Sequence, residues 1–413
     1  MDFFDCISLA KAQALIEGTL ADIVVSIEEV ELLQALGRIA AEDIAADGDL
    51  PPFNRSTVDG YAVLSRDTFG AGEGIPAMLT IVGEILMGQA AETDILSGQA
   101  VAIPTGGMLP AGADAVVMLE HIEPSGNETL LVLKPVAPGE NVVSKGEDIK
   151  TGAVFITAGT KLTSAEIGAL AACGTSRVKM RRRLTVGIVS TGDEVVDIGA
   201  TPAAGQVRDI NSYALAAILT EAGCQVSCYG IVKDNYAELL QIIDKAVAEN
   251  HLVLVSGGSS VGVRDHTVRV IEELGQQKVI FHGLAIRPGK PTILGMVGEV
   301  PVFGLPGHPV AAMTVCQTVV LAAVKKMQGG KPLRVGCQVS AKLTRSCASA
   351  PGRDDFLRVR LIWHEGEYLA EPVLGKSGLI SVLTQADGIV QIPAEASGLY
   401  AGDVVSVEVM REA

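Results

Sequence analysis

Between residues 184 and 309, apolar runs of strand length lead repeatedly into loops of Gly, Ser, Thr and Asp. These loops are residues 190–194, 256–262, 287–291 and 304–309. In a parallel α/β sheet the carboxyl ends of the strands lie along one edge, and ligands bind there. Glycine lets the backbone approach a ligand, and unpaired N–H groups at the next helix start favour an anion. The pattern therefore predicts an anion-binding crevice built from these loops.

Several carboxylates accompany these loops and suit a hard cation such as Mg²⁺. They are Asp193, Glu194, Asp209, Asp234 and Asp265. For Asp265 and Asp209 two readings stay open, because a cap at a helix start needs no ligand, whereas a phosphate-bound metal would lie in the same place. Asn211 is expected to cap the helix after Asp209. Asp234 and Glu194 are interpreted as functional, since Asn235 already caps the next helix and Glu194 can face the crevice. Phosphate donors beside carboxylates indicate nucleotide or pyrophosphate chemistry.

The elements that position these loops alternate between strand and helix. Strands are predicted at residues 186–190, 226–232, 251–256 and 301–305, and helices follow from Asn211, Asn235, Asp265 and Pro309. Proline suits the first turn of a helix, where its missing N–H would have no partner. Alternation of this kind is the signature of right-handed crossovers. The predicted fold class is α/β plus β, with a central doubly wound, mostly parallel α/β domain.

The rest of the chain divides into three further parts. Residues 1–50 with 141–178 are predicted to form a discontinuous mixed domain, which includes a helix begun by Thr163 and Glu166 as a capping box. Residues 51–140 are interpreted as an inserted β-rich domain, residues 179–328 as the α/β domain, and residues 329–413 as a small β-barrel. The basic run of residues 179–183 is interpreted as a solvated linker rather than a binding patch.

Bulk composition limits the class of ligand. The 413-residue chain has a formal net charge of −16 and a pI near 4.9, which argues against nucleic-acid partners and anionic membrane surfaces. An anionic ligand must be received by local cations, for which Arg264, Arg287 and Lys290 are placed. The N-terminus shows no signal-peptide pattern, and the longest apolar stretch, residues 310–324, is too short to span a bilayer. A cytoplasmic protein without a membrane partner is expected.

Standard nucleotide and catalytic fingerprints are missing from the sequence. It has no P-loop, no Gly-x-Gly-x-x-Gly opening a βαβ unit and no Gly-x-Ser-x-Gly elbow. Ser256 is therefore expected to donate hydrogen bonds rather than to attack a substrate. Seven cysteines without a Cys-x-x-Cys pair are expected to be free thiols, and the scattered histidines argue against a zinc enzyme. Three polar segments, residues 51–63, 103–107 and 145–148, fit a structural turn or a site equally well.

Taken together, these segments resemble the molybdopterin molybdenumtransferase family, the bacterial MoeA type to which the E domain of gephyrin also belongs. The resemblance runs from about Ser8 to the carboxyl end, over several motifs in a fixed order. The matching stretches are residues 51–63, 103–120, 146–149, 190–194, 208–211, 256–262, 287–291 and 304–309. The resemblance implies an elongated four-domain protomer and a homodimer whose active site is shared between protomers. It also implies that molybdate is inserted into adenylylated molybdopterin, with release of AMP in the presence of Mg²⁺.

The resemblance assigns roles to particular positions of this sequence. Those assigned to catalysis are Asp59, Asp148, Glu194, Asp234 and Asp265, of which the last three are expected to hold Mg²⁺. Those assigned to substrate binding are Thr105, Ser256, Gly257, Gly258, Arg287, Lys290, Pro306, Pro309 and Ser377. Gly257 and Gly258 would let backbone N–H groups cradle phosphates, while Arg287 and Lys290 would attract the molybdate dianion.

Some positions depart from the family pattern. His308 and Ala311 stand where many relatives have Asn and Ser, Arg287 stands where Lys is frequent, and Gly283 stands where a further Lys is common. These changes leave the choice between molybdate and tungstate open. Two other functions also stay open: a molybdopterin adenylyltransferase, which uses a similar α/β domain, and a non-catalytic molybdopterin-binding scaffold or carrier. The long β-rich N-terminal half weighs against the adenylyltransferase, since a lone α/β domain would suffice for it.

Overall fold

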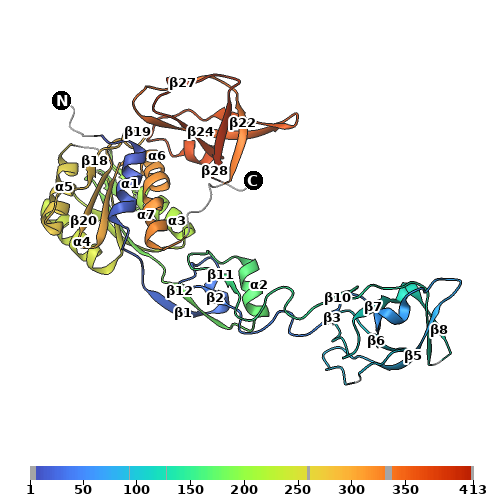
Figure 1. Ribbon diagram of the computed structural model, residues 1–413. Helices are drawn as coiled ribbons and strands as arrows, with labels where there is room; N and C mark the ends of the chain where they lie inside the picture. The colour runs from blue at the N-terminus through green and yellow to red at the C-terminus, as the bar shows by residue number, and fades with distance from the viewer. Residues whose placement is uncertain (1–5, 93, 127, 258–260, 331–336, 411–413) are drawn as a thin grey trace.

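A computed structural model describes residues 6–92, 94–126, 128–257, 261–330 and 337–410 of the protein, with only the backbone described at residues 261–265. The molecule is elongated (Figure 1). The α/β domain and the C-terminal β domain lie together at one end, the mixed domain follows, and the inserted β-rich domain lies at the far end. The predicted fold class, a doubly wound α/β domain within an elongated chain of β-rich and mixed parts, is confirmed.

The α/β domain is built on a six-stranded sheet with the strand order β16-β13-β17-β21-β20-β18. Its strands are β13 (Thr185–Thr191), β16 (Gln225–Val232), β17 (Leu252–Gly257), β18 (Phe281–His282), β20 (Ile293–Val297) and β21 (Val300–Leu305). Neighbours from β16 to β21 pair in parallel, whereas β20 and β18 are antiparallel. The central strands are nearly continuous apolar runs, because helices cover both faces of the sheet.

The two helices that follow β16 and β21 begin where the sequence signals predict. One face of the sheet carries α1 (Leu9–Thr19), α3 (Asn211–Glu221), α6 (Pro309–Val315), the π-helical segment η4 (Cys316–Val320) and α7 (Leu321–Met327), and the other carries α4 (Tyr236–Glu249) and α5 (Val261–Gly275). Asn235 Oδ1 accepts from the N–H groups of Ala237 (2.9 Å) and Glu238 (3.2 Å), as expected of the cap of α4. Pro309 occupies the first turn of α6, also as predicted.

Helices α6 and α7 continue through η4 as one apolar rod, Pro309–Met327. Within the described chain it is the one helix long and apolar enough to cross a membrane, so the prediction that this apolar stretch is too short to do so is wrong. Length and composition alone are weak evidence, since the core helix of a globular domain has the same properties. Here most of the apolar window is buried against the sheet and α1. The rod is therefore accounted for by packing inside the α/β domain.

Helix α1 packs with the α/β domain, although the predicted grouping placed residues 1–50 with 141–178. Leu9, Ala12 and Ile16 recur at helical spacing and are buried in the same core as Phe303 and Val324. Burial of a Leu or Ile side chain stabilises by roughly 1.5–3 kcal/mol, which holds the N-terminal segment on this domain. The observed packing therefore differs from the prediction at the N-terminal end.

The mixed domain combines short strand pairs with a helix. Its elements are β1 (Ile27–Glu31) paired with β12 (Arg177–Arg181), β2 (Ile44–Ala45) paired with β11 (Val154–Ile156), the turn η1 (Leu32–Ala35) and helix α2 (Ser164–Ala172). The predicted capping box is confirmed. The Thr163 hydroxyl oxygen accepts from the Ala165 N–H, and the Glu166 carboxylate accepts from the Thr163 N–H at 2.7 Å.

The prediction that residues 179–183 form a solvated linker is wrong. The first part of this run belongs to β12, in which Val178 and Met180 are buried while Lys179 faces outward to Glu42. This alternation is that of a strand with one face on a core. Arg182, Arg183 and Leu184 connect the strand to the α/β sheet.

The inserted domain holds a six-stranded sheet in the order β7-β4-β6-β5-β9-β8. Its elements are β4 (Gly60–Val63), β5 (Ala77–Glu84), β6 (Gln99–Ile103), β7 (Ala115–Met118), β8 (Ile122–Ser125) and β9 (Thr129–Val132), with the 3₁₀ turns η2 (Ser65–Thr68) and η3 (Leu119–His121). Two short strands, β3 (Arg55–Ser56) and β10 (Val142–Val143), pair where the chain enters and leaves this domain.

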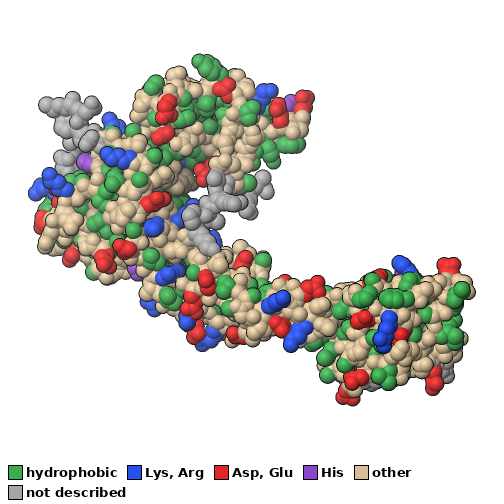
Figure 2. Space-filling model, viewed as in Figure 1, with side chains coloured by type: hydrophobic (Ala, Val, Ile, Leu, Met, Phe, Trp, Pro, Cys, Tyr) green, Lys and Arg blue, Asp and Glu red, His purple; other side chains and the backbone are tan. Residues whose placement is uncertain are grey.

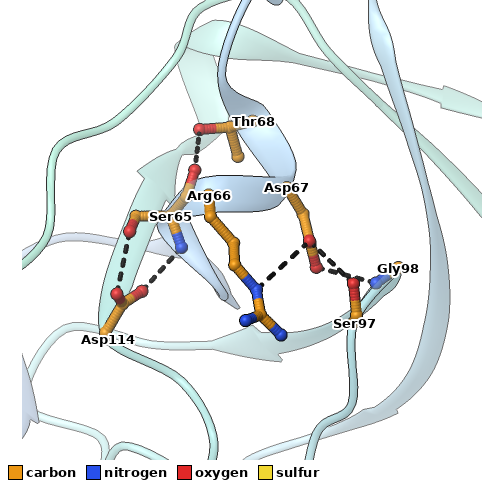
Figure 3. Close-up of polar contacts among 7 residues, drawn as sticks. All are labelled: Ser65, Arg66, Asp67, Thr68, Ser97, Gly98 and Asp114. Carbon is orange, nitrogen blue, oxygen red and sulfur yellow. Dashed lines mark hydrogen bonds and ion pairs between the residues drawn. The ribbon is translucent and has the colours of Figure 1, made fainter.

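Side-chain hydrogen bonds fix η2 against the inserted sheet (Figure 3). The Asp114 carboxylate accepts from both the N–H (2.6 Å) and the hydroxyl (2.8 Å) of Ser65, and the Thr68 hydroxyl donates to the Ser65 carbonyl (2.7 Å). Asp67 accepts from the Ser97 hydroxyl at 2.8 Å. Because buried polar groups need partners, this network explains why so many hydroxyl and carboxylate groups occur at this corner.

The C-terminal domain is a closed five-stranded barrel, as predicted. Its strands pair in the order β24 (Asp354–His364), β25 (Glu367–Pro372), β22 (Gln338–Leu343), β28 (Val404–Val409) and β26 (Gly388–Ile392), and β26 pairs back with β24. Beside it lie the pair β23 (Cys347–Ala348) and β27 (Gly398–Leu399) and the helix α8 (Ser381–Gln385). One strand from the α/β segment, β19 (Ile286–Arg287), pairs with β24 and so fixes the barrel next to the loop of residues 287–291.

Candidate functional site

The strand order of the α/β sheet reverses between β13 and β17. β13 leads through α3 to β16 on one side, whereas β17 and β21 lie on the other side (Figure 1). In open α/β sheets such a switch point leaves a crevice at the carboxyl ends of the strands. The loops after β13, β16 and β17 therefore meet at one edge, as the sequence predicts.

Gly257 lies where the backbones of β13 and β17 come closest at this edge. Its φ of +145° is rare for other residues, and a Cβ built there would lie 2.0 Å from the Thr191 carbonyl oxygen. Glycine is therefore required here. Ser256, the residue before it, is buried. Gly258, the residue after it, lies outside the described residues, so its predicted role stays a prediction.

Asp193, Glu194 and Asp234 form a carboxylate cluster at the ends of β13 and β16. The Asp234 N–H donates to Asp193 Oδ1 (3.2 Å), and Lys233 Nζ donates to the carbonyl oxygens of Asp193 (3.0 Å) and Val195 (3.2 Å). Partial loss of solvation raises the pKa of Asp234, and the charges of Asp193 and Glu194 raise it further. The structure thus brings two predicted Mg²⁺ ligands, Glu194 and Asp234, close enough for their charges to interact.

The chain after this cluster reaches α3 through two short paired strands, β14 (Val195–Val196) and β15 (Val207–Arg208). The predicted cap by Asn211 is wrong, because Asp209 Oδ1 accepts from the Ser212 N–H (3.1 Å) in the first turn. Asn211 Nδ2 instead donates to Ser256 Oγ and to the Gly307 carbonyl, each at 2.9 Å. Asn211 thereby ties the end of β17 to the loop after β21, and Asp209 serves the helix start.

Two buried polar atoms at this edge have no hydrogen-bond partner among the described residues. They are Thr191 Oγ1 and Asn211 Oδ1. Since buried polar atoms are nearly always paired, both are suited to contact a ligand. Neither residue stands out in the sequence, where Asn211 has the position of a helix cap and Thr191 is one polar loop residue among several. Only their burial and their missing partners distinguish them.

The same edge opens into a cavity of about 1230 Å³ between the α/β domain and the barrel, called here the barrel cavity. Its lining includes Arg287, Lys290, Pro306 and His308 from the α/β side and Arg353, Lys376 and Ser377 from the barrel side, and all of these except Pro306 are basic or polar. Four predicted substrate-binding residues, Arg287, Lys290, Pro306 and Ser377, are therefore gathered here. Arg353 was not predicted, because no motif connects it with loops that precede it by about sixty residues in the sequence.

Contacts between the two domains position the basic groups of the barrel cavity. In the pairing of β19 with β24, Arg287 stands opposite Asp355. The Asp355 carboxylate lies 3.5 Å from Arg287 Nη1 and 3.0 Å from Arg353 Nε. Across the cavity, His308 Nδ1 and Ser377 Oγ are 3.0 Å apart. The cavity is thus basic, with one carboxylate that holds two of its guanidinium groups in place.

Pro309, another predicted substrate-binding residue, is buried in the first turn of α6. The next residues, Val310 and Ala311, line the barrel cavity. The described contacts of Pro309 are therefore those of a helix start that supports the cavity wall.

Asp59, Thr105 and Asp148 lie in other parts of the molecule. Asp59 Oδ1 accepts from the N–H (2.7 Å) and the hydroxyl (3.0 Å) of Thr105, and these bonds hold the pKa of Asp59 below its usual range. Both residues are exposed on the inserted domain, far from the α/β domain (Figure 1). Asp148 is exposed near the mixed domain, where its N–H donates to the Leu50 carbonyl. Within one chain these three residues do not share a crevice with the carboxylate cluster.

Asp265 lies inside α5, so the prediction that it caps this helix is wrong. The helix begins at Val261, four residues earlier. The side chains of Asp265 and Arg264 lie outside the described residues, and their predicted roles stay predictions. In the described part of the chain no group of three or more His, Cys, Asp or Glu is arranged to hold a metal ion. Mg²⁺ commonly takes one or two carboxylates and completes its shell with water and substrate phosphates, which the carboxylate cluster can accommodate.

Comparison with known proteins shows to which family the chain belongs. Family models match in order along the chain: "MoeA N-terminal region (domain I and II)" over residues 7–174, "Probable molybdopterin binding domain" over 187–326 and "MoeA C-terminal region (domain IV)" over 340–410. The molybdopterin molybdenumtransferase of Haemophilus influenzae is 34% identical, over 92% of this chain and 93% of that protein. The chain belongs to the MoeA family.

Further MoeA-family proteins match over the whole length. The molybdopterin molybdenumtransferase of Bacillus subtilis is 31% identical, over 93% of this chain and 90% of that protein. A crystal structure of a MoeA protein from Pyrococcus horikoshii has a TM-score of 0.82 at 38% identity, covering 99% of this chain and 100% of that one. A second, from Pyrococcus horikoshii OT3, has a TM-score of 0.85 at 30% identity, covering 98% and 100%. The predicted family resemblance is confirmed.

Proposed function

We propose that this protein is a molybdopterin molybdenumtransferase, which inserts molybdate into adenylylated molybdopterin and releases AMP. The observation that carries the proposal is that one sheet edge holds both a carboxylate cluster and a basic cavity, with Asn211 joining the end of β17 to the loop that reaches the cavity. The reaction brings together two anions, a pyrophosphate-bearing substrate and an oxyanion, and this edge offers a separate place for each. Relatives that carry the molybdenumtransferase name support the assignment.

The pyrophosphate of the adenylylated substrate fits the crevice between β13 and β17. Gly257 keeps the backbone open there, and α5 begins just beyond, so its first N–H groups are available to an anion. The unpartnered Thr191 Oγ1 can donate to a phosphate oxygen, and Asn211 Oδ1 can accept from a hydroxyl or ring N–H. Ser256 Oγ is already held by Asn211, which agrees with a binding role rather than a nucleophilic one.

The carboxylate cluster suits Mg²⁺, with Glu194 and Asp234 as ligands. When bound, the ion neutralises the pyrophosphate and stabilises negative charge on the departing AMP. Partial burial and then the charges of Asp193 and Glu194 raise the pKa of Asp234, and a bound cation would relieve that charge repulsion, which supports this assignment. Lys233 fixes the loop that carries Asp193 through its bonds to two loop carbonyls.

The barrel cavity suits molybdate, a compact dianion. Arg287 and Lys290 supply positive charge, and the Ser377 hydroxyl and His308 ring supply hydrogen-bonding groups at its mouth. Asp355 orients the Arg287 guanidinium through an ion pair. Because the chain carries a formal charge of −16, an oxyanion needs such a local group of cations in order to bind.

We further propose that the active unit is a homodimer in which the inserted domain of one chain completes the site of the other. Support comes from the position of Asp59 and Thr105, far from the carboxylate cluster of their own chain (Figure 1). Two apolar side chains beside them are strongly exposed, Leu119 at 51% and Met87 at 62%. The Leu119 N–H donates to the Asp59 carbonyl at 3.2 Å. Exposed apolar groups next to functional polar ones are typical of a surface that another protein covers.

The two alternative functions are less well supported. A molybdopterin adenylyltransferase would need only the α/β domain, and a scaffold without turnover would not need clustered carboxylates. The barrel cavity and the inserted domain favour molybdate insertion, since both add groups outside the α/β domain. We propose a cytoplasmic location, in keeping with biosynthetic relatives, while the expected lack of nucleic-acid and membrane partners rests on the acidic composition and stays a prediction.

AMP release tests the proposal directly. Purified protein is incubated with adenylylated molybdopterin, Mg²⁺ and molybdate, and AMP is measured by chromatography. We expect release that requires molybdate and is lost in Asp234→Asn, whereas Asp244→Asn, an exposed carboxylate of α4 in the same domain, keeps the wild-type rate. Full activity of Asp234→Asn would contradict the proposal. ATP-dependent adenylylation of molybdopterin would support the adenylyltransferase instead, and binding without turnover would support the scaffold.

A further inference from the structure

A second cavity, of about 540 Å³, lies where the mixed domain meets the α/β domain. We call it the junction cavity. Its walls are formed by residues 36–39, 159–161 and 181–183 of the mixed domain and its connection, by residues 220–223 at the end of α3, and by α7 with Gln328 and Gly330. None of the site residues described above lines it.

The junction cavity is strongly basic. The basic side chains in its lining are Arg38, Lys161, Arg181, Arg182, Arg183 and Lys325. Within the described chain Glu221 is the one acidic residue of the lining. Arg38 and Arg182 share the Glu28 carboxylate. Among the described residues, no ion pair is formed by the other four cations, Lys161, Arg181, Arg183 and Lys325. So much uncompensated positive charge is unusual in a chain with a formal charge of −16. On the face seen in Figure 2, blue side chains gather where these two domains join.

Arg38 adds an independent sign that an acceptor belongs here. Its side chain is only 9% exposed. One terminal nitrogen bonds to Glu28 and to the Arg181 carbonyl (2.9 Å), but Arg38 Nε is buried without a hydrogen-bond partner among the described residues. A buried guanidinium N–H is rarely left unpaired. The arrangement therefore calls for an acceptor that the described protein does not supply.

The lining also has large apolar side chains, which are those of Leu36, Ile39, Leu321 and Val324. A lining that combines basic and apolar side chains suits a ligand with an apolar body and an anionic group, and the volume is in the range of small-molecule sites. A neighbouring hollow of about 470 Å³ shares Arg38, Arg182 and Arg183, so the basic surface continues beyond the cavity mouth.

We propose that the junction cavity binds a small organic anion. Its phosphate or carboxylate group contacts Arg38, Arg183 and Lys325, and its apolar body lies against Ile39 and Leu321. Such a ligand touches the mixed domain and α7 together, and so stabilises one arrangement of the two domains. This site is separate from the carboxylate cluster and the barrel cavity, and it does not depend on the proposed molybdenumtransferase activity.

Calorimetric titration with naphthyl phosphate tests this proposal. The full-length protein carries Arg287→Ala and Lys290→Ala, so that the barrel cavity does not compete for the probe. Arg183→Ser with Lys325→Ser removes two cations from the junction cavity. Arg177→Ser with Lys326→Ser is the matched control, because it removes the same charge from the same strand region and the same helix at positions outside the lining. Circular dichroism checks that all variants are folded.

We expect saturable binding with a Kd that the junction variant raises about tenfold or more and that the matched control leaves unchanged. Inorganic phosphate should compete, and naphthol, which lacks the anionic group, should bind far more weakly. Equal Kd values in both double variants would overturn the proposal. Absence of saturable binding, or naphthol binding as tight as naphthyl phosphate, would overturn it as well.

Discussion

Asn211→Ala tests whether the two parts of the proposed active site depend on one side chain. Asn211 is 8% exposed, and its amide donates to Ser256 Oγ and to the Gly307 carbonyl at 2.9 Å each. A buried hydrogen bond contributes about 1 kcal/mol to stability. Loss of both bonds should therefore lower the free energy of unfolding of the α/β domain by about 2 kcal/mol.

Activity should fall beyond what this loss of stability explains. A destabilisation of about 2 kcal/mol leaves most of a typical domain folded at 25 °C. The loop of Gly307 and His308 nevertheless loses its bond to the end of β17, and the substrate loses the unpartnered Asn211 Oδ1. One lost contact in the transition state is worth about tenfold in rate, so AMP release should fall by about tenfold or more.

Urea unfolding, followed by far-ultraviolet circular dichroism, measures the stability, and the initial rate of AMP release measures the activity. Asn235→Ala is the matched control, since Asn235 also lies at a helix start of this domain but bonds only to backbone N–H groups. That variant should lose about 1 kcal/mol of stability and keep its rate of AMP release. If Asn211→Ala loses no more activity than Asn235→Ala, the reasoning is refuted.

Three further predictions concern Asp234, the shared active site and the buried Arg358. The pKa of Asp234 is raised in the folded protein. Ionised Asp234 therefore lowers the free energy of unfolding at pH values above this folded-state pKa. This loss of stability disappears as the pH falls through the folded-state pKa and the carboxylate becomes protonated. Asp234→Asn should therefore raise the melting temperature at neutral pH without Mg²⁺, and Mg²⁺ should stabilise the variant less than the wild type; a lower melting temperature would contradict this. Mixed dimers of Asp59→Ala and Asp234→Ala chains should recover about a quarter of wild-type AMP release, because half of the dimers are mixed and each then has one intact site; no recovery would speak against a shared site. Arg358 is 4% exposed, its pKa is lowered by burial to about 10, and it contacts Thr314 and Gln317. Arg358→Met should cost less stability in urea unfolding than Arg358→Ala, since an apolar chain of similar length replaces a buried cation well; equal losses would contradict this.

Short-range signals predicted the α/β domain well. The buried runs of β13 and β17, the cap at Asn235 and the proline of α6 each depend on neighbours in the sequence, so the pattern alone fixes them. The capping box of Thr163 and Glu166 is of the same kind. The loop glycine Gly257 was also recognisable, because a strand that ends in glycine at a sheet edge indicates close backbone approach.

Long-range packing decided what the sequence could not predict. α1 joins the α/β core because its apolar face meets α7, which lies three hundred residues further along the chain. The basic run after Arg177 looks like a linker until the burial of Met180 shows that it is a strand. Arg353 reaches the barrel cavity only because β24 pairs with β19. No local pattern encodes such contacts.

The dependence of AMP release on molybdate concentration tests most directly whether the carboxylate cluster and the barrel cavity serve one reaction. The wild-type rate should rise with molybdate and reach a plateau. The Arg287→Ala, Lys290→Ala double variant should need at least about tenfold more molybdate to approach that plateau. Arg360 is an exposed barrel residue outside the cavity lining, and the Arg360→Ala variant should show the wild-type dependence on molybdate. AMP release at the full rate without molybdate, or an unchanged molybdate dependence in the double variant, would contradict the account.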